Sequence, residues 1–196
     1  MSMVPRRDGS AAETERDDEA RLLAAVARRE IRAFEALYRA YHPRLTRFLM
    51  IMTRRAHLVE EVLDDTMMVV WDRPDGFRGA SKLSTWIFAI AYRKALKAMK
   101  RQDQPVEDKV AEARPSPEPG PEQLLASRQL QGVLFDAMAE LSTDHRAVVD
   151  LAYYQDMGYR QIAEIMDCPV DTVKTRMFHA RRRLKASLDG GGADWL

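Results

Sequence analysis

Residues 159–183 read YRQIAEIMDCPVDTVKTRMFHARRR, and this stretch decides the fold of the second half of the chain. Apolar side chains recur at helical spacing up to Met166, and Pro169 then prevents the helix from continuing. Asp171 or Thr172 is placed to cap a second helix. The pattern predicts two helices joined by a tight turn, which is the layout of a helix-turn-helix that reads the DNA major groove. An ordinary helical hairpin with a solvated basic face is the alternative.

Composition indicates a soluble globular chain whose charge is segregated. The 196 residues carry a formal net charge of +1, with 46% hydrophobic and 31% charged residues. Residues 56–72 hold acids but no Lys or Arg, whereas residues 93–101 hold bases but no acid. An acidic stripe suits a basic protein surface, and a basic stripe suits a polyanion.

Several classes of protein are disfavoured by what the sequence lacks. Cys168 is the only cysteine, so no intrachain disulfide forms and no cysteine-based zinc site is expected. We expect neither a metal nor another cofactor. No apolar run approaches bilayer length and no apolar signal core follows the N-terminus, so a cytoplasmic location is expected.

Periodicity and proline content divide the chain into two all-α domains. We expect a disordered N-terminal extension over residues 1–17 and a first helical domain over 18–101. A proline-rich flexible linker follows over 102–121. The second helical domain covers 122–188, and residues 189–196 form a flexible tail.

Local signals predict where several helices begin, bend or end. The apolar pattern of the first domain starts at Asp18, and Pro43 should kink or divide its second helix. A third helix is expected over residues 57–71, and Ser81 or Ser84 caps a fourth.

In the second domain, Ser142 is placed as the N-cap of a helix over residues 143–155, and Gly158 marks the turn after it. The glycines at 190–192 should end the order of the chain.

Three motifs give the chain a family resemblance. They are AFEALYRAYHPRL (33–45), STWIFAIAY (84–92), and LSTDHRAVV (141–149) followed by the helix-turn-helix. In this order the chain resembles compact sigma factors of the extracytoplasmic-function (ECF) group of the sigma-70 family, over residues 18–188. The resemblance implies a non-enzymatic protein that binds core RNA polymerase, through the β′ clamp helices and the β flap. It also implies recognition of −10 and −35 promoter DNA, duplex melting and transcription initiation.

The resemblance assigns polymerase docking to the acidic helix, where opposite charges speed encounter and apolar anchors supply contact area. The family commonly shows Gln-Glu where this chain has Asp64-Asp65. A solvated helix face is the alternative. The expected docking residues are Glu60, Glu61, Asp64, Asp65, Met68 and Trp71.

The loop after the third helix and the helix that follows it match the family's −10 reader. Separated bases need a shaped pocket or aromatic surface, and phosphates need cations. Trp86 fits the core better than a stacking platform, and Tyr92 fits either place. The expected residues are Phe77, Arg78, Gly79, Ala80, Ser81, Lys82, Trp86, Tyr92, Arg93, Lys94 and Lys97.

The −35 element is assigned to the second helix of the helix-turn-helix. Arg and Lys suit guanine edges and phosphates, and Thr suits either. Asp167 stands where the turn often has glycine, and Asp tolerates the left-handed conformation. Asp171 also replaces a common glycine, and its carboxylate would repel phosphate unless it has another task. The expected residues are Asp171, Thr172, Lys174, Thr175, Arg176, His179, Arg182 and Arg183.

The family also implies an anti-sigma factor that covers both domains, with the linker permitting a closed and an extended arrangement. Two other functions compete. A homodimeric helix-turn-helix regulator explains the DNA-binding motif but leaves the acidic helix without a task. An enzyme is disfavoured because the four histidines are scattered and no HExxH, P-loop or nucleophile elbow is present.

Overall fold

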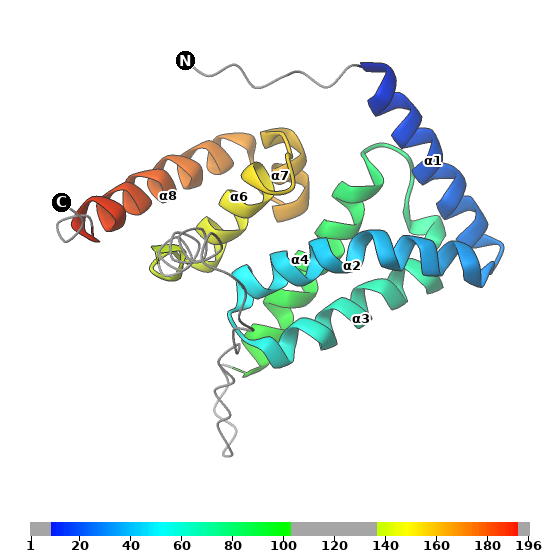
Figure 1. Ribbon diagram of the computed structural model, residues 1–196, viewed down its shortest axis with the longest axis horizontal. Helices are drawn as coiled ribbons and strands as arrows, with labels where there is room; N and C mark the ends of the chain where they lie inside the picture. Colours follow the sequence, from blue (N-terminus) through cyan, green and yellow to red (C-terminus); the bar gives the residue numbers. More distant parts are fainter. Residues whose placement is uncertain (1–8, 103–136, 192–196) are drawn as a thin grey trace, which may run out of the picture.

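The computed structural model describes residues 9–102 and 137–191, and the regular elements in those ranges are all helical (Figure 1). Expectations for the linker and for the start of the second domain lie outside the described residues. The elements are α1 (Gly9–Ala27), α2 (Ile31–Thr53), α3 (Ala56–Asp72), the 3-10 turn η1 (Pro74–Gly76), α4 (Leu83–Gln102), α6 (Thr143–Tyr153), α7 (Tyr159–Met166) and α8 (Val170–Gly191).

Helices α1 to α4 form the first unit around an apolar core. The buried side chains of α2 recur at three- and four-residue steps, so one face of the helix turns toward α3 and α4. Phe48 and Phe88 meet edge to face with ring centroids 5.3 Å apart. The positions of α3 and α4 confirm the helices expected from the sequence.

Two features of this unit differ from expectation. Helix α1 begins at Gly9 rather than near Asp18, so the disordered extension predicted for residues 1–17 is wrong from Gly9 onward. Residues 9–17 include two alanines, two glutamates and one arginine, whose high helix propensity favours a helix there. Pro43 was expected to kink or divide the second helix, and it lies inside a continuous α2, so the helix is not divided. Tyr41 and Leu45 are buried on either side of it, and their packing offsets the missing N–H.

Helices α6, α7 and α8 form the second unit, and its turns follow the sequence signals closely. The Ser142 hydroxyl caps α6 by accepting from the His145 backbone N–H at 3.4 Å, as expected. Gly158 precedes α7 and donates its N–H to the Gln161 side chain at 3.1 Å. Asp167 adopts the left-handed conformation with φ of 50°, which confirms that the turn accepts aspartate there.

Both ends of α8 differ from the boundaries predicted from the sequence. The helix begins at Val170, so Asp171 and Thr172 lie in its first turn instead of capping it. The N–H of Thr172 donates to the Pro169 carbonyl at 2.9 Å, which starts the helix one residue earlier. The helix also continues to Gly191, beyond the end expected near residue 188.

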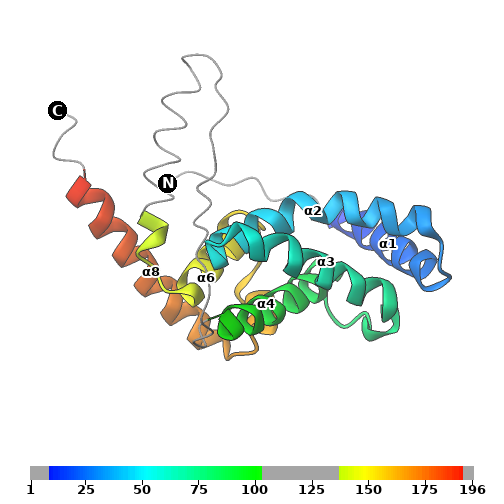
Figure 2. The ribbon, with the colours of Figure 1, turned by 90° about the horizontal axis from the view of Figure 1, so that it is seen from below.

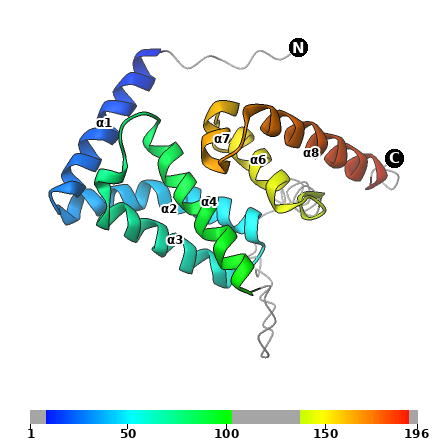
Figure 3. The ribbon, with the colours of Figure 1, turned by 180° about the vertical axis from the view of Figure 1, so that it is seen from behind.

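The two units pack against each other. Helix α7 lies against α4, and α6 crosses the C-terminal end of α2, while α8 lies on the outside (Figures 1 and 3). Figure 2 shows the same arrangement from below, with α1 and α8 at opposite ends of the molecule. Among the described helices, none has the length and apolar character required to span a bilayer.

Candidate nucleic-acid interface

The contact between α4 and the second unit is held by polar side chains. The Asp144 carboxylate accepts the Tyr92 hydroxyl at 2.8 Å and forms an ion pair with Arg176 at 2.5 Å. Gln161 on α7 donates to the Thr85 hydroxyl on α4 at 3.1 Å. Burial and the hydrogen bond to Asp144 raise the pKa of Tyr92, so its phenol stays a proton donor. The Asp144 carboxylate therefore contacts both Tyr92, a residue expected to bind the −10 element, and Arg176, a residue expected to bind the −35 element.

A second set of polar contacts joins α2 to α6. The Asp150 side chain has no exposed surface and lies 3.4 Å from the Arg47 guanidinium. Gln155 donates to the other carboxylate oxygen at 3.3 Å and accepts from Arg44 at 3.0 Å. Burial raises the pKa of Asp150, whereas Gln155 and Arg47 oppose that rise. Gln155 and Arg47 therefore both stabilise the Asp150 anion, and Arg47 does so from α2.

Arg146 is a buried cation that also bridges the units. Its guanidinium donates to the carbonyl of Leu141 at 2.7 Å and to that of Met52 at 3.0 Å. Met52 lies in the last turn of α2, where a cation also favours the helix dipole. Burial lowers the pKa of Arg146, although a guanidinium remains charged at neutral pH.

The −35 candidates lie on α8, and most of their side chains face solvent. Asp171 is paired with Lys174 at 2.9 Å, and this hydrogen bond lowers the pKa of Asp171. This exposed pair partly offsets the charge of Asp171 within the helix. The Thr175 hydroxyl donates to the Asp171 carbonyl at 2.9 Å. His179, Arg182 and Arg183 are exposed, and Thr172 is half-buried.

Arg176 differs from the other −35 candidates. Its side chain is only 25% exposed, because it turns toward Asp144 and lies 3.6 Å from the Cys168 sulfur. In this arrangement it supports the packing of α8 on α6 instead of facing a DNA groove.

One exposed aromatic was missed from the sequence. Phe178 is 62% exposed on α8. It shares a helical face with Lys174 and Thr175, four and three residues earlier. The spacing was the available signal, but the sequence analysis gave Phe178 no role. An exposed phenyl group on this face suits contact with a thymine methyl group.

The −10 candidates divide into an exposed loop and a packed helix. Gly79 has a φ of 71° in an open part of the loop, and the side chains of Arg78, Ala80 and Lys82 are exposed. Ser81 is half-buried.

Three aromatic side chains of the same region are turned inward. Phe77 and Trp86 are half-buried and pack together with centroids 5.8 Å apart. Tyr92 is buried at 4% exposure, so its ring is not presented to a DNA strand in this arrangement.

The acidic and basic stripes lie next to each other on α3 and α4. Lys94 pairs with Asp65 at 3.0 Å, and Arg101 pairs with Glu61. Arg93 and Lys97 are exposed on α4. The exposed charges of the two helices therefore partly compensate each other. From the sequence, the acidic and basic stripes were predicted as two separate surfaces.

The remaining polymerase-docking candidates on α3 differ in how far they reach solvent. Glu60 and Asp64 are exposed, and Asp64 accepts from Tyr38 at 3.4 Å. Met68 is 51% exposed on the same helix. Trp71 is half-buried against Phe34, with centroids 5.1 Å apart. Met68 is thus the more accessible of the two apolar anchors.

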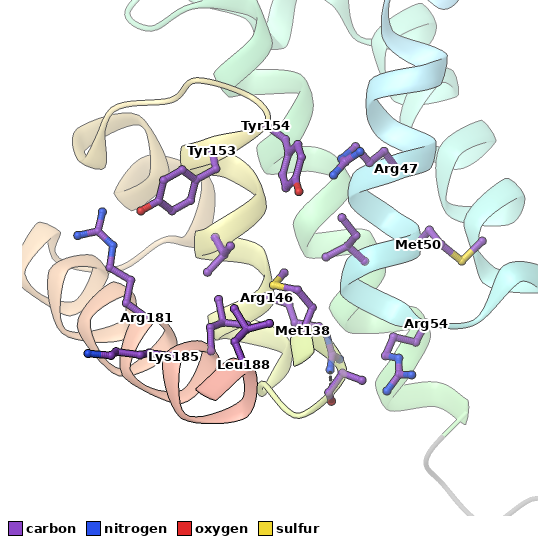
Figure 4. Close-up of a pocket in the computed structure, with 14 residues that line it drawn as sticks. Arg47, Met50, Arg54, Met138, Arg146, Tyr153, Tyr154, Arg181, Lys185 and Leu188 are labelled. Atoms are coloured by element: carbon purple, nitrogen blue, oxygen red, sulfur yellow. Dashed lines mark hydrogen bonds between the residues drawn. The ribbon is translucent and has the colours of Figure 1, made fainter. Parts of the chain in front are cut away.

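A groove of about 870 Å³ runs between α2, α6 and α8 (Figure 4). Its floor is apolar, and its rim carries cations from both units. No carboxylate is among the residues that line it: Arg47, Met50, Ile51, Arg54, Met138, Ala139, Arg146, Val149, Tyr153, Tyr154, Arg181, Leu184, Lys185 and Leu188. Within residues 9–102 and 137–191, no cluster of His, Cys, Asp or Glu is arranged to hold a metal ion.

Comparison with known proteins agrees with this geometry. The family model for sigma-70 region 2 matches residues 37–104, and the model for sigma-70 region 4 matches residues 131–184. The ECF RNA polymerase sigma-E factor of Haemophilus influenzae is 29% identical over 174 residues, covering 84% of this chain and 92% of that protein. The ECF RNA polymerase sigma-E factor of Escherichia coli is 32% identical over 136 residues, covering 64% and 71%.

A solved structure shows the same fold with a partner. The sigma factor RpoE of Bartonella quintana, in complex with the anti-sigma factor NepR, matches with a TM-score of 0.62 and 25% identity, covering 80% of this chain and 96% of that one. The chain therefore belongs to the ECF RNA polymerase sigma factors of the sigma-70 family. Membership of this family favours sigma activity over a homodimeric regulator.

Proposed function

We propose that the two units of this sigma factor divide promoter recognition between them. The α1–α4 unit docks on core RNA polymerase and holds the separated −10 strand, and the α6–α8 unit reads the −35 duplex. The observation that carries this assignment is the exposed basic and aromatic face of α8 in a chain that also carries an exposed acidic helix. Action on promoter DNA places the protein in the cytoplasm.

Run-off transcription tests this function directly. Core RNA polymerase supplied with the purified chain should begin transcripts at discrete positions on genomic templates, and core alone should not. Tight binding to palindromic duplexes without polymerase, combined with no core-dependent start, would instead support the homodimeric regulator.

Polymerase docking is assigned to the exposed side of α3. Glu60, Glu61, Asp64 and Asp65 would steer the helix to the cationic β′ clamp helices, and the β flap would receive the α6–α8 unit. The pairs of Asp65 with Lys94 and Glu61 with Arg101 are exposed, so exchange for polymerase cations costs little. Met68 would supply the apolar anchor, with Trp71 supporting the helix from below.

Replacing Met68 with Lys should weaken core binding by about 2 kcal/mol, roughly 30-fold, because it puts a charge at the apolar centre of the contact. The free energy of unfolding should stay unchanged, since Met68 is half exposed. Titration of labelled factor with core polymerase measures the effect. Ile31→Lys is the matched control, because Ile31 is 57% exposed on another helix. If Met68→Lys and Ile31→Lys bound core polymerase with equal affinity, Met68 would not be part of the contact.

On the DNA side, the loop at residues 77–82 would hold an unpaired base, and Arg93, Lys94 and Lys97 would follow the strand phosphates. On α8, Lys174, Thr175 and Phe178 share one face and would read base edges. Arg182 and Arg183 would contact phosphates.

The packed arrangement of the two units is proposed as the inactive state of the factor. Tyr92 of the first unit is buried and donates to Asp144 of the second unit, so its ring is not available to DNA in this arrangement. We assign its stabilisation to an anti-sigma factor, as the Bartonella relative is bound to one. The groove between α2, α6 and α8 supports this assignment, because an amphipathic helix with acidic flanks would match its apolar floor and cationic rim. Distances between labels on the two units should increase when the factor binds core RNA polymerase, and unchanged distances would contradict the proposal.

A further inference from the structure

A small hollow between the start of α6 and the middle of α8 has the properties of an anion site. Its volume is about 380 Å³, and the side chains that line it are His145, His179, Arg182, Arg183 and Ala186. No carboxylate lines it. Two histidines and two arginines from different helices thus converge on one space.

His145 is the member that the −35 assignment does not explain. It lies in the first turn of α6, and its ring centroid is 6.4 Å from that of His179 on α8. The two imidazoles therefore approach the hollow from opposite helices. The N-terminal end of α6 adds the positive end of a helix dipole.

The neighbouring charges leave the hollow cationic. Asp144 is the acid next to His145, but its carboxylate forms an ion pair with Arg176 inside the same unit. The pKa of His145 is lowered by burial first, then by His179, Arg176 and Arg183, whereas Asp144 raises it. His145 is therefore neutral at neutral pH in the free protein, and an arriving anion would reverse that balance.

We propose that this hollow binds a backbone phosphate of the DNA duplex that α8 reads, with His145 and His179 as its imidazole ligands. This assignment rests on the proposed −35 role of α8. A phosphate flanking the major groove lies beside a recognition helix, which is where Arg182 and Arg183 already extend. His145 accepts a proton from solution as the phosphodiester binds, because the bound charge favours imidazolium. Affinity for DNA consequently rises as pH falls.

The test uses the full chain and a labelled 20-base-pair duplex of random sequence, because a phosphate contact does not depend on base sequence. Affinity is measured at pH 6 and pH 8 at several salt concentrations. His145→Gln should bind about 3- to 10-fold more weakly than wild type at pH 6 and equally at pH 8. At pH 6 the slope of log affinity against log salt should fall by about 0.9, one phosphate contact.

Three companion arms make the result decisive. His145→Lys keeps a permanent charge at this position, so it should bind the duplex more tightly than wild type at pH 8. His42→Gln changes a histidine on α2 and should behave as wild type at both pH values. Millimolar inorganic phosphate should not compete with the duplex if the site is built for DNA, and full competition would assign it to free phosphate instead.

Equal duplex binding by His145→Gln and wild type at both pH values would overturn the proposal, as would an equal loss at both. Core-dependent run-off transcription by the same preparation separates this outcome from failure of the sigma function. A wild-type chain that initiates normally while His145 has no pH-linked effect refutes the phosphate site alone.

Discussion

Replacing Arg146 with Met should lower the free energy of unfolding by about 2–4 kcal/mol, because buried hydrogen bonds from a charged group are lost while the volume is kept. The carbonyls of Leu141 and Met52 would both lose their guanidinium donor. Since Met52 belongs to the first unit and Arg146 to the second, the same change should also loosen the contact between the units. Urea unfolding followed by circular dichroism measures the first effect, and scattering of the native protein measures the second.

Arg182→Met is the matched control for this change. Arg182 is exposed on α8, so its replacement should alter stability by less than about 0.5 kcal/mol. If Arg146→Met were as stable as this control, the buried guanidinium would not hold the units together.

Replacing Asp144 with Asn should shift the factor from its closed to its open arrangement. The change weakens the hydrogen bond from Tyr92, which crosses the units, although a neutral oxygen remains. It also removes the ion pair with Arg176 inside the second unit, which positions the Asp144 side chain. Because the site is partly exposed, we expect a loss of about 1–2 kcal/mol, roughly a 5- to 30-fold shift toward open molecules. Distance distributions between labels on the two units should broaden, and half-maximal initiation should need less factor.

Two further variants isolate the contact between the units. Glu164→Gln removes the same charge from an exposed position on α7, so it reports the general electrostatic effect. Tyr92→Phe removes the hydrogen bond from the α4 side, and in that background Asp144→Asn should open the protein less than it does alone. Additive effects of the two changes would mean that Asp144 does not act through Tyr92.

Local sequence signals predicted the local structure of the second unit well. The Ser142 cap, the left-handed Asp167 and the break at Pro169 each depend on a few neighbouring residues, and each was placed correctly. The start of α8 moved by one or two residues, since Asp171 pairs with Lys174 instead of capping. Such boundary shifts are the usual error of local rules.

Contacts between distant segments could not be predicted in the same way. Arg47 contacts Asp150 and Tyr92 contacts Asp144 across separations of 103 and 52 residues. Helical periodicity identifies the apolar face of each helix, but it does not predict how two folded units pack against each other. The periodicity fitted Tyr92 equally to the core and to a DNA contact, whereas in the structure Tyr92 is buried and donates to Asp144. Arg176 was assigned by residue type to a DNA face, whereas an acid from another helix draws it inward.

The same limit applies to the charged stripes. Each stripe was visible as a run of like charges, but their mutual pairing depends on how α3 and α4 pack. The role of each candidate in polymerase or DNA binding remains a prediction that the experiments above address.

Reversible locking of the closed arrangement tests most directly whether the units must separate for initiation. Arg47 and Tyr154 are exposed and in contact across the units, with the guanidinium 3.4 Å from the ring centroid. Arg47→Cys and Tyr154→Cys, introduced with Cys168→Ser, provide two thiols for a short disulfide-forming crosslinker. With core polymerase, the crosslinked factor should initiate at least about tenfold less than the same protein after reduction, because the open state is withheld. Equal initiation before and after reduction would contradict the account.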